Sequence, residues 1–215
     1  EVDSALVVNI MESPILYSFC RCPYAMRARM SLLESGVEVE LREVILRDRP
    51  EHMMEISPKG TVPVLLLPDG TVIEESLDIM LWSLDDSWLV GDWKNLIDVN
   101  DGDFKYHLDR YKYNNRYENV LSSEEHREHA VSILKTYDER LSNQAYLCGE
   151  SISLVDLALS PFVRQFANTD RGWFNQLRLP HLLKWLEGIL ESNLFKGCMV
   201  KHKQWEEGDE PVFFV

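Results

Sequence analysis

The pattern of apolar residues changes once along this chain, and that change limits the folds that the sequence can adopt. Up to about residue 85, short apolar runs that predict strands alternate with helical stretches, which is typical of the α/β class. From Asp98 onward the spacing is helical almost throughout. We therefore expect an α+β chain of two domains: residues 1–84, a linker near 85–92, and an all-helical domain at residues 94–215.

The first part carries strand and helix signals in the order βαβαββα. Gly36 is expected to end the first helix, because glycine adopts the left-handed conformation of a C-cap without strain. Strands are expected at 15–19, 37–44, 62–67 and 71–73, with helices at 24–34, 51–56 and 74–84. In the second part, helices are expected at 104–121, 123–141, from 153 onward, at 179–190, and briefly after 192.

Cys22 precedes Pro23 where the first strand gives way to the first helix. Proline suits the first helical position because it has no N–H to lose and its φ is already helix-like. Cys22 would then be the N-cap, with unpaired N–H groups and the positive end of the helix dipole directed at its sulfur. That environment favours the nucleophilic thiolate. The alternative is that Cys22 is a small buried apolar residue.

Composition excludes several classes of function. The net charge of −14 argues against binding to a nucleic-acid backbone or to an anionic membrane. No apolar run approaches the roughly 20 residues that span a bilayer, and the N-terminus lacks the basic start and apolar core of a signal peptide. The four cysteines are too few and too scattered for a secreted disulfide scaffold, which predicts a reducing cytoplasm. No metal-ligand spacing is recognisable.

The order βαβαββα resembles a thioredoxin-like domain. Followed by an all-helical half, it resembles the cytosolic glutathione transferase superfamily over nearly the whole chain. Cys22-Pro23-Tyr24 is similar to the glutaredoxin active site, with Ala25 in place of the second cysteine. Residues 19–27 look most like the omega-class and dehydroascorbate-reductase branches, which use a cysteine where other classes use tyrosine or serine. The match continues through 49–51, 57–65 and 75–76.

The resemblance implies a glutathione site. It implies a cis bond between Val62 and Pro63, which leaves the Val62 backbone free to pair with the tripeptide as a short added strand. Ser76, at a helix start, would hold the γ-glutamyl carboxylate, and Glu75 the α-ammonium group. Arg49 stands where relatives carry a lysine for the glycine carboxylate. From the residues alone, a trans Pro63 at a strand start and a Ser76 that merely caps its helix remain open.

Other candidate residues keep two interpretations. Cys20 is expected on the opposite face from Cys22, because a disulfide between them would close a very short loop; a resolving role stays open. Cys148 and Cys198 are expected to be packing residues, and Asp156 to cap a helix with Ser153. The residues that could line a second-substrate pocket are Tyr106, Arg110, Tyr113, Tyr117 and Trp205, although an aromatic stripe at helical spacing favours core or dimer interface.

The sequence therefore predicts a glutathione-dependent thiol transferase or reductase in which Cys22 forms a mixed disulfide with a small-molecule or protein substrate. The resemblance also implies a homodimer. Two rival functions remain: a conventional conjugating glutathione transferase, and a non-enzymatic regulatory protein with the transferase fold, resembling the stringent starvation protein.

Overall fold

The computed structural model describes residues 13–118 and 120–214. Its sheet has the strand order β4-β3-β1-β2-β5. β1 runs parallel to β2 and antiparallel to β3, and β3 and β4 form a hairpin. The strands are β1 (Ile15–Ser18), β2 (Val39–Glu43), β3 (Val64–Leu66), β4 (Val72–Ile73) and β5 (Phe213–Phe214). The predicted α+β fold, a thioredoxin-like half followed by a helical half, is confirmed.

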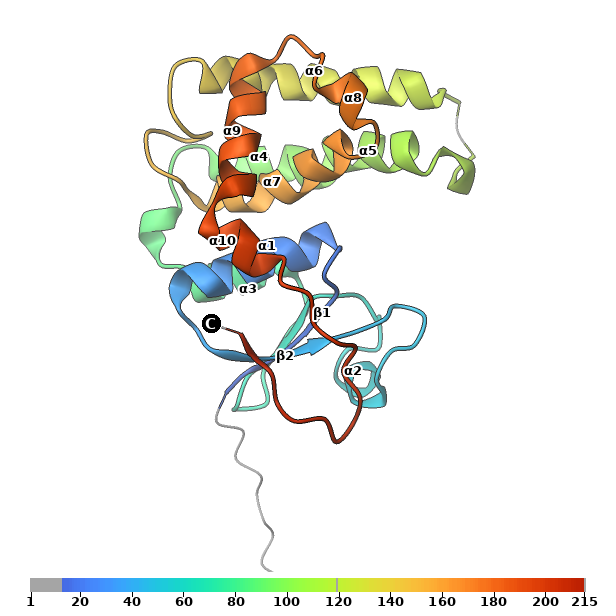
Figure 1. Ribbon diagram of the computed structural model, residues 1–215, viewed down its shortest axis with the longest axis vertical. Coiled ribbons are helices and arrows are strands. Elements are labelled where there is room, and N and C mark those ends of the chain that lie inside the picture. The colour runs from blue at the N-terminus through green and yellow to red at the C-terminus, as the bar shows by residue number, and fades with distance from the viewer. Residues whose placement is uncertain (1–12, 119, 215) are drawn as a thin grey trace, which may run out of the picture.

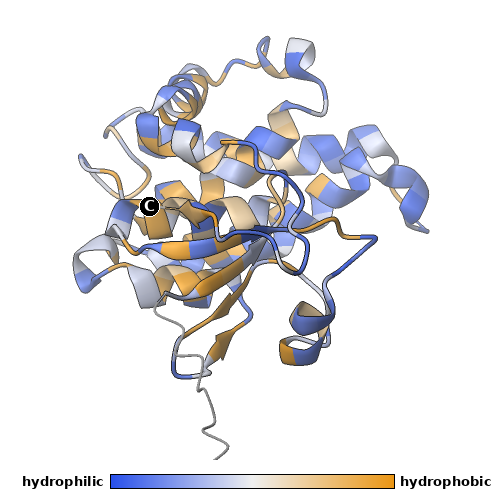
Figure 2. Cartoon of the chain, turned by 60° about the horizontal axis from the view of Figure 1, so that its bottom comes forward, coloured by the Kyte–Doolittle hydropathy of each residue, from blue (hydrophilic) through white to orange (hydrophobic). Residues whose placement is uncertain are grey.

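The two faces of the sheet bury different helices. Leu16 of β1 packs with residues of α1 (Pro23–Ser35) and α3 (Ser76–Ser83), whereas Ile15 and Tyr17 pack with Met53 of α2 (Glu51–Ile56). This alternation follows from the two-residue period of a strand. Figure 1 shows α1 and α3 between the sheet and the helical half, and in Figure 2 the strands are largely apolar. Gly36 ends α1 at φ 69°, as predicted.

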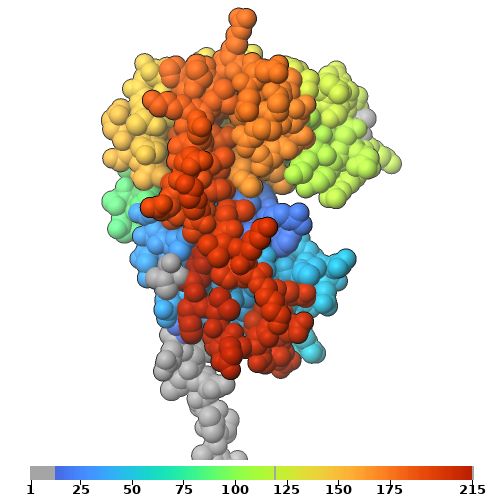
Figure 3. All heavy atoms as spheres, viewed as in Figure 1, coloured from blue at the N-terminus to red at the C-terminus, as the bar shows by residue number. Residues whose placement is uncertain are grey.

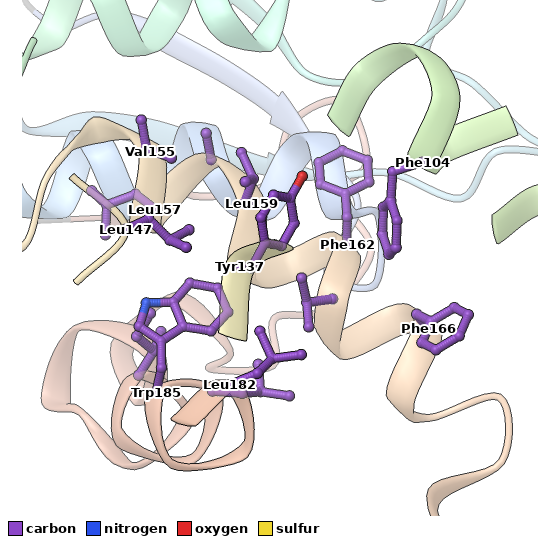
Figure 4. Packing of buried hydrophobic residues seen from close by; sticks show 14 of the residues in the cluster. Phe104, Tyr137, Leu147, Val155, Leu157, Leu159, Phe162, Phe166, Leu182 and Trp185 are labelled. Carbon is purple, nitrogen blue, oxygen red and sulfur yellow. The ribbon is translucent and has the colours of Figure 1, made fainter. Parts of the chain in front are cut away.

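The helical half packs around one apolar core, in which Phe104, Tyr137, Phe162 and Trp185 meet (Figure 4). Asp156 caps α7 as predicted: it accepts from the Ser153 N–H, and it also accepts from the Trp185 indole N–H. The helices are α4 (Trp93–Val99), the π-helical segment η2 (Asn100–Phe104), α5 (Lys105–Lys112), α6 (Ser123–Leu141), α7 (Leu154–Ala167), α8 (Arg171–Phe174), α9 (Pro180–Glu191) and α10 (Asn193–Cys198), with single 3-10 turns η1 (Asp86–Trp88) and η3 (Asn114–Arg116).

The expected helix at 104–121 is wrong at its end. α5 ends at Lys112, and a 3-10 turn begins at Asn114. Asparagine is a weak helix former, and Ser122 forms a capping box with Glu125 that starts the next helix. The helix also continues upstream of Phe104, through η2 and α4.

The C-terminal tail was not expected to have a structured role. After α10 ends at Cys198, the chain returns to the sheet (Figures 1 and 3). There β5 pairs antiparallel with β2, which would otherwise be an edge strand. The Leu41 N–H also donates to the Val212 carbonyl at 2.7 Å. The tail thereby covers a strand edge that would otherwise present unpaired backbone groups.

Two expectations concern the ends and the surroundings of the chain. The absence of a signal peptide was predicted from residues 1–12, which lie outside the described residues. Within residues 13–118 and 120–214, no helix combines the length and apolar character needed to cross a membrane.

Candidate functional site

Cys22 lies where the sequence placed it, as the N-cap of α1 with Pro23 at the first helical position. Its φ and ψ are −76° and 121°, the extended conformation of an N-cap. The Cys22 N–H donates to the Phe19 carbonyl at 3.0 Å, which closes the turn between β1 and α1. The sulfur is therefore held at the start of a helix by the chain that precedes it.

The expected activation of this thiol needs a correction. Burial raises the pKa of Cys22 above its usual value. The backbone N–H groups of Ala25 and Tyr24 act in the opposite direction, followed by the charges of Arg29 and Lys105. The helix N-terminus thus favours the thiolate as expected, but desolvation outweighs it.

The Val62-Pro63 peptide bond is cis, as predicted. The Cys22 thiol faces the Val62 carbonyl oxygen at 3.8 Å, a weak S–H contact. Among the residues that the structure describes, the Val62 N–H has no hydrogen-bond partner. The backbone at Val62 therefore offers both a donor and an acceptor beside the sulfur.

Ser76 begins α3, and its hydroxyl takes part in a longer network. The Ser76 hydroxyl accepts a hydrogen bond from Arg27 Nε at 2.9 Å. Arg27, on α1, is itself buried and holds Asp101 of η2 through two parallel bonds of 2.8 and 2.7 Å. The interpretation of Ser76 as a simple helix cap is wrong, because Glu75 is the N-cap of α3. The Ser76 hydroxyl is instead joined to the helical half of the molecule through the ion pair between Arg27 and Asp101.

Glu75 and Arg49 each contact one short segment. Glu75 forms an ion pair with Lys59, and Arg49 Nε donates to the Gly60 carbonyl at 2.5 Å. Gly60 has φ +64°, and a Cβ there would lie 3.1 Å from Arg49 Nε. Only glycine fits this approach without strain. The sequence gives Lys59 no role, because lone basic residues in loops are usually solvated.

The segment 59–62 contacts three of the predicted positions. Lys59 contacts Glu75, Gly60 contacts Arg49, and Val62 contacts Cys22. Four residues of chain span at most about 13 Å. The predicted thiol, backbone, carboxylate and arginine groups therefore surround a strip of roughly tripeptide length.

The remaining candidates lie elsewhere. Tyr106 and Tyr117 are exposed and flank Arg110, whose guanidinium lies 3.6 and 4.3 Å from their ring centres. They are therefore not core residues.

Trp205 stacks on Arg42 and lines a cavity of about 1200 Å³. Arg49 and His52 also line this cavity, but Cys22 does not. The four cysteines are free, so Cys20 and Cys22 are not bridged.

Family models match both halves of the chain: "Glutathione S-transferase, N-terminal domain" at residues 16–87 and "Glutathione S-transferase, C-terminal domain" at residues 117–188. The chain belongs to the cytosolic glutathione S-transferase superfamily. Cys22, Val62, Glu75 and Ser76 all lie within the first matched segment.

Similarity to individual glutathione transferases extends over most of the chain. A probable glutathione S-transferase, parA of Nicotiana tabacum, is 27% identical over 207 residues, covering 88% of this chain and 90% of that protein. Glutathione S-transferase omega-1 of Rattus norvegicus is 39% identical over 62 residues, 29% of this chain and 26% of that protein. A transferase family member from Pseudomonas fluorescens, solved with two glutathione bound, has a TM-score of 0.76 at 18% identity, covering 87% of this chain and 92% of that one.

Three residues that contact the predicted positions directly or through a neighbour were not themselves predicted: Arg27, Asp101 and Lys59. Arg27 lies one helical turn beyond Pro23 on α1, and its sequence context gives no sign that it is buried. Asp101 follows Ser76 by 25 positions, and only the packing of α1 against the helical half brings its carboxylate to Arg27. Only Lys59 could have been found from the sequence, because it lies three positions before Val62 in the same short segment.

Proposed function

We propose that this chain is a cysteine-type glutathione transferase that acts as a thiol transferase or reductase and forms a mixed disulfide at Cys22. The observation that carries the proposal is the position of Cys22: the sulfur lies at the N-terminus of α1, against the backbone of Val62. A peptide that pairs with the Val62 backbone as an added strand would bring its own cysteine sulfur close to Cys22. A tyrosine or serine at this position would instead leave the glutathione sulfur free.

The surrounding residues suit glutathione as co-substrate. The Val62 N–H and carbonyl can pair with its cysteinyl backbone, as a strand pairs with a sheet edge. Ser76 lies at the start of α3, where N–H groups favour a carboxylate, and Glu75 offers a partner for the α-ammonium group. Arg49 offers the guanidinium for the glycine carboxylate at the far end of the segment 59–62.

The proposed reaction is a pair of thiol–disulfide exchanges. The Cys22 thiolate attacks the glutathione sulfur of a mixed disulfide. A sulfur–sulfur bond forms on Cys22 while the original one breaks, and the substrate leaves as a thiolate that takes up a proton. The thiolate of a second glutathione then attacks the adduct, releases glutathione disulfide and returns the Cys22 thiolate. Position 25, in the first turn of α1, is an alanine and has no thiol. Glutathione itself therefore supplies the second thiol.

Mass spectrometry after incubation with glutathione disulfide tests the proposal. We expect one glutathione adduct on the wild-type chain, located on Cys22, and an unchanged adduct in the Cys20→Ala control. Cys22→Ala should abolish both the adduct and the reductase activity. An unmodified Cys22, or reductase activity that survives Cys22→Ala, contradicts the mechanism.

Conjugation of glutathione to an electrophile is the second candidate function. It is favoured by the similarity to the tobacco protein over 88% of the chain. The Ser76, Arg27 and Asp101 network would serve either chemistry, because its hydrogen bonds do not involve the sulfur. Turnover of an aryl halide that survives Cys22→Ala would support conjugation. Failure to bind a glutathione-agarose column, together with no adduct, would instead support the regulatory alternative.

Three predictions about the protein as a whole belong to the same proposal. We infer a cytoplasmic homodimer that binds neither nucleic acid nor membrane. We also place the domain boundaries at residue 84 and residue 94, on either side of η1. Sedimentation of the purified chain tests the dimer, and limited proteolysis between 85 and 93 tests the boundaries.

A further inference from the structure

The loop that carries Cys22 is held from behind by Arg29. This side chain, on α1, is 2% exposed. Its guanidinium donates to the Ser18 hydroxyl at 2.6 Å, the Phe19 carbonyl at 3.3 Å and the Cys20 carbonyl at 2.8 Å. Three successive residues of the turn are therefore tied to one rigid fork. The Phe19 carbonyl is also the acceptor for the Cys22 N–H.

Glu43, at the end of β2, holds the same loop from the other side. Its Oε1 accepts the Cys20 N–H at 2.7 Å. The Val44 N–H donates to the Ser18 carbonyl at 2.8 Å and continues the pairing of β1 with β2. Between them, Arg29 and Glu43 engage both the N–H and the carbonyl of Cys20.

Each of these two residues also binds the beginning of the C-terminal tail. Arg29 Nε donates to the Cys198 carbonyl at 3.0 Å, where α10 ends. The Glu43 carbonyl accepts the Trp205 N–H at 2.8 Å. The tail therefore meets the Cys22 loop through two shared residues, before β5 pairs with β2.

Arg29 is also a buried charge whose position bears on the sulfur. Among the described residues, no carboxylate lies within 4.0 Å of its guanidinium. The charged and titratable groups near the thiol are Arg29 and Tyr24 on α1, and Lys105 on α5. The two cations favour the Cys22 thiolate and so partly offset its burial.

We propose that Arg29 and Glu43 are positioning residues for the Cys22 sulfur, and that through them the C-terminal tail holds the loop that carries it. The use of that sulfur rests on the proposed function above. The positioning itself can be measured on the thiol without glutathione, so the two can fail separately.

The rate of Cys22 alkylation by iodoacetamide, measured between pH 6 and pH 10, tests the role of Arg29. Cleavage after Glu12 and Glu34 gives one peptide that contains both cysteines in every variant, and its fragment ions assign the label to Cys20 or to Cys22. Arg29→Gln should lower the Cys22 rate at pH 7.5 about fivefold and move the rise of the profile to higher pH. Arg29→Lys keeps the charge and should stay within about twofold of wild type.

Arg21→Gln is the matched control, because Arg21 adjoins Cys22 in sequence but is exposed and lies over the Phe19 ring. It should leave the profile unchanged. An Arg29→Gln profile that coincides with that of Arg21→Gln overturns the role of Arg29. A purely structural role would lower the folded fraction without moving the profile, which circular dichroism of the same samples detects.

A chain that ends at Lys203 tests the tail, because it lacks the Trp205 N–H and β5. Hydrogen exchange of the Cys20 and Cys22 amides should accelerate at least fivefold, while the amides of α9 stay unchanged. Glu43→Ala should accelerate hydrogen exchange of the Cys20 amide by a similar factor. This variant replaces Arg29→Gln as the test of the loop contacts if Arg29→Gln does not fold. Unchanged exchange at both amides in the shortened chain overturns the coupling between tail and loop.

Discussion

The two ends of the candidate glutathione site are built differently. The thiol end, Cys22 with Val62, depends on burial, backbone groups and the start of one helix. The serine end, Ser76 with Glu75, is surrounded by charged side chains: Lys59 pairs with Glu75, and Arg27 joins Ser76 to Asp101. At the thiol end, the position of Cys22 is set by its neighbour Pro23, whereas the serine end depends on charged side chains that meet only in the folded chain.

This difference predicts different sensitivities. Groups at the thiol end respond to pH, because burial controls the protonation of a sulfur. At the serine end the ion pairs differ in their exposure: Arg27 is buried, while the side chains of Lys59 and Glu75 are 38% and 68% exposed. Buried ion pairs are costly to break and exposed ones contribute little.

The largest effect is expected at the serine end, from Asp101→Ala. Removing this carboxylate leaves the buried Arg27 guanidinium without the ion-pair partner that it has among the described residues. We expect a loss of about 3 kcal/mol in the free energy of unfolding, together with weaker binding of glutathione through Ser76. Urea denaturation and calorimetric titration with glutathione measure the two effects.

The double variant Arg27→Met with Asp101→Leu provides the control. Replacing both charges with apolar groups of similar size should restore most of the stability, while binding of glutathione stays weak because Ser76 has lost its partner. Equal stability of Asp101→Ala and wild type would show that the serine end is no more dependent on long-range charge than the thiol end.

At the thiol end, the alkylation rate of Cys22 should rise about tenfold for each pH unit from pH 6 to pH 8, without reaching a plateau. Burial raises the pKa of Cys22, so the thiolate fraction is still increasing through this range. A raised pKa in the folded state also means that this group's contribution to stability is present below the usual thiol pKa and is lost at higher pH.

Iodoacetamide kinetics followed by mass spectrometry supply the profile, with Cys22→Ser as the blank. An alkylation rate that reaches a plateau below pH 7 would show that Cys22 has the low pKa that the sequence predicts. In that case the helix N-terminus, and not burial, dominates at the thiol end.

The same contrast explains how much the sequence revealed. Pro23 and Gly36 mark the ends of α1 by local backbone preferences, so Cys22 could be placed at an N-cap without a structure. The number of strands and helices in the first half followed from apolar periodicity. In contrast, the desolvation of Cys22 and the contact of Arg27 with Asp101 depend on residues far apart in the chain, and no local pattern carries that information.

The C-terminal tail illustrates a second limit. Residues 211–215 read as a short apolar end, and β propensity alone gave no reason to place them beside β2. The strand forms because β2 is an edge that the tail can reach after α10 turns back. Such pairing is decided by topology.

A smaller effect is expected from Lys59→Met, which removes the exposed partner of Glu75. We expect a change in unfolding free energy below about 0.5 kcal/mol, and a rise of about threefold in KM for glutathione as Glu75 loses its orientation. Activity assays at low and high salt measure the effect, because exposed pairs are screened by salt. Lys94→Met, which removes a surface lysine whose cation lies over Trp93, is the matched control. A fall in KM would mean that Lys59 competes with the glutathione ammonium group for Glu75.

The smallest effect is expected from Arg49→Lys, and it bears on whether Arg49 belongs to either end. Arg49 is exposed and donates through Nε to Gly60, so a lysine keeps the charge while losing the planar fork. If the charge holds the glycine carboxylate of glutathione, KM should rise less than about twofold in Arg49→Lys and about fivefold in Arg49→Ala. Equal KM values in wild type and Arg49→Ala would assign Arg49 to the cavity that it shares with His52 and Trp205. The glutathione site would then end at Gly60, and the group that binds the glycine carboxylate would have to come from another residue of the segment 57–62.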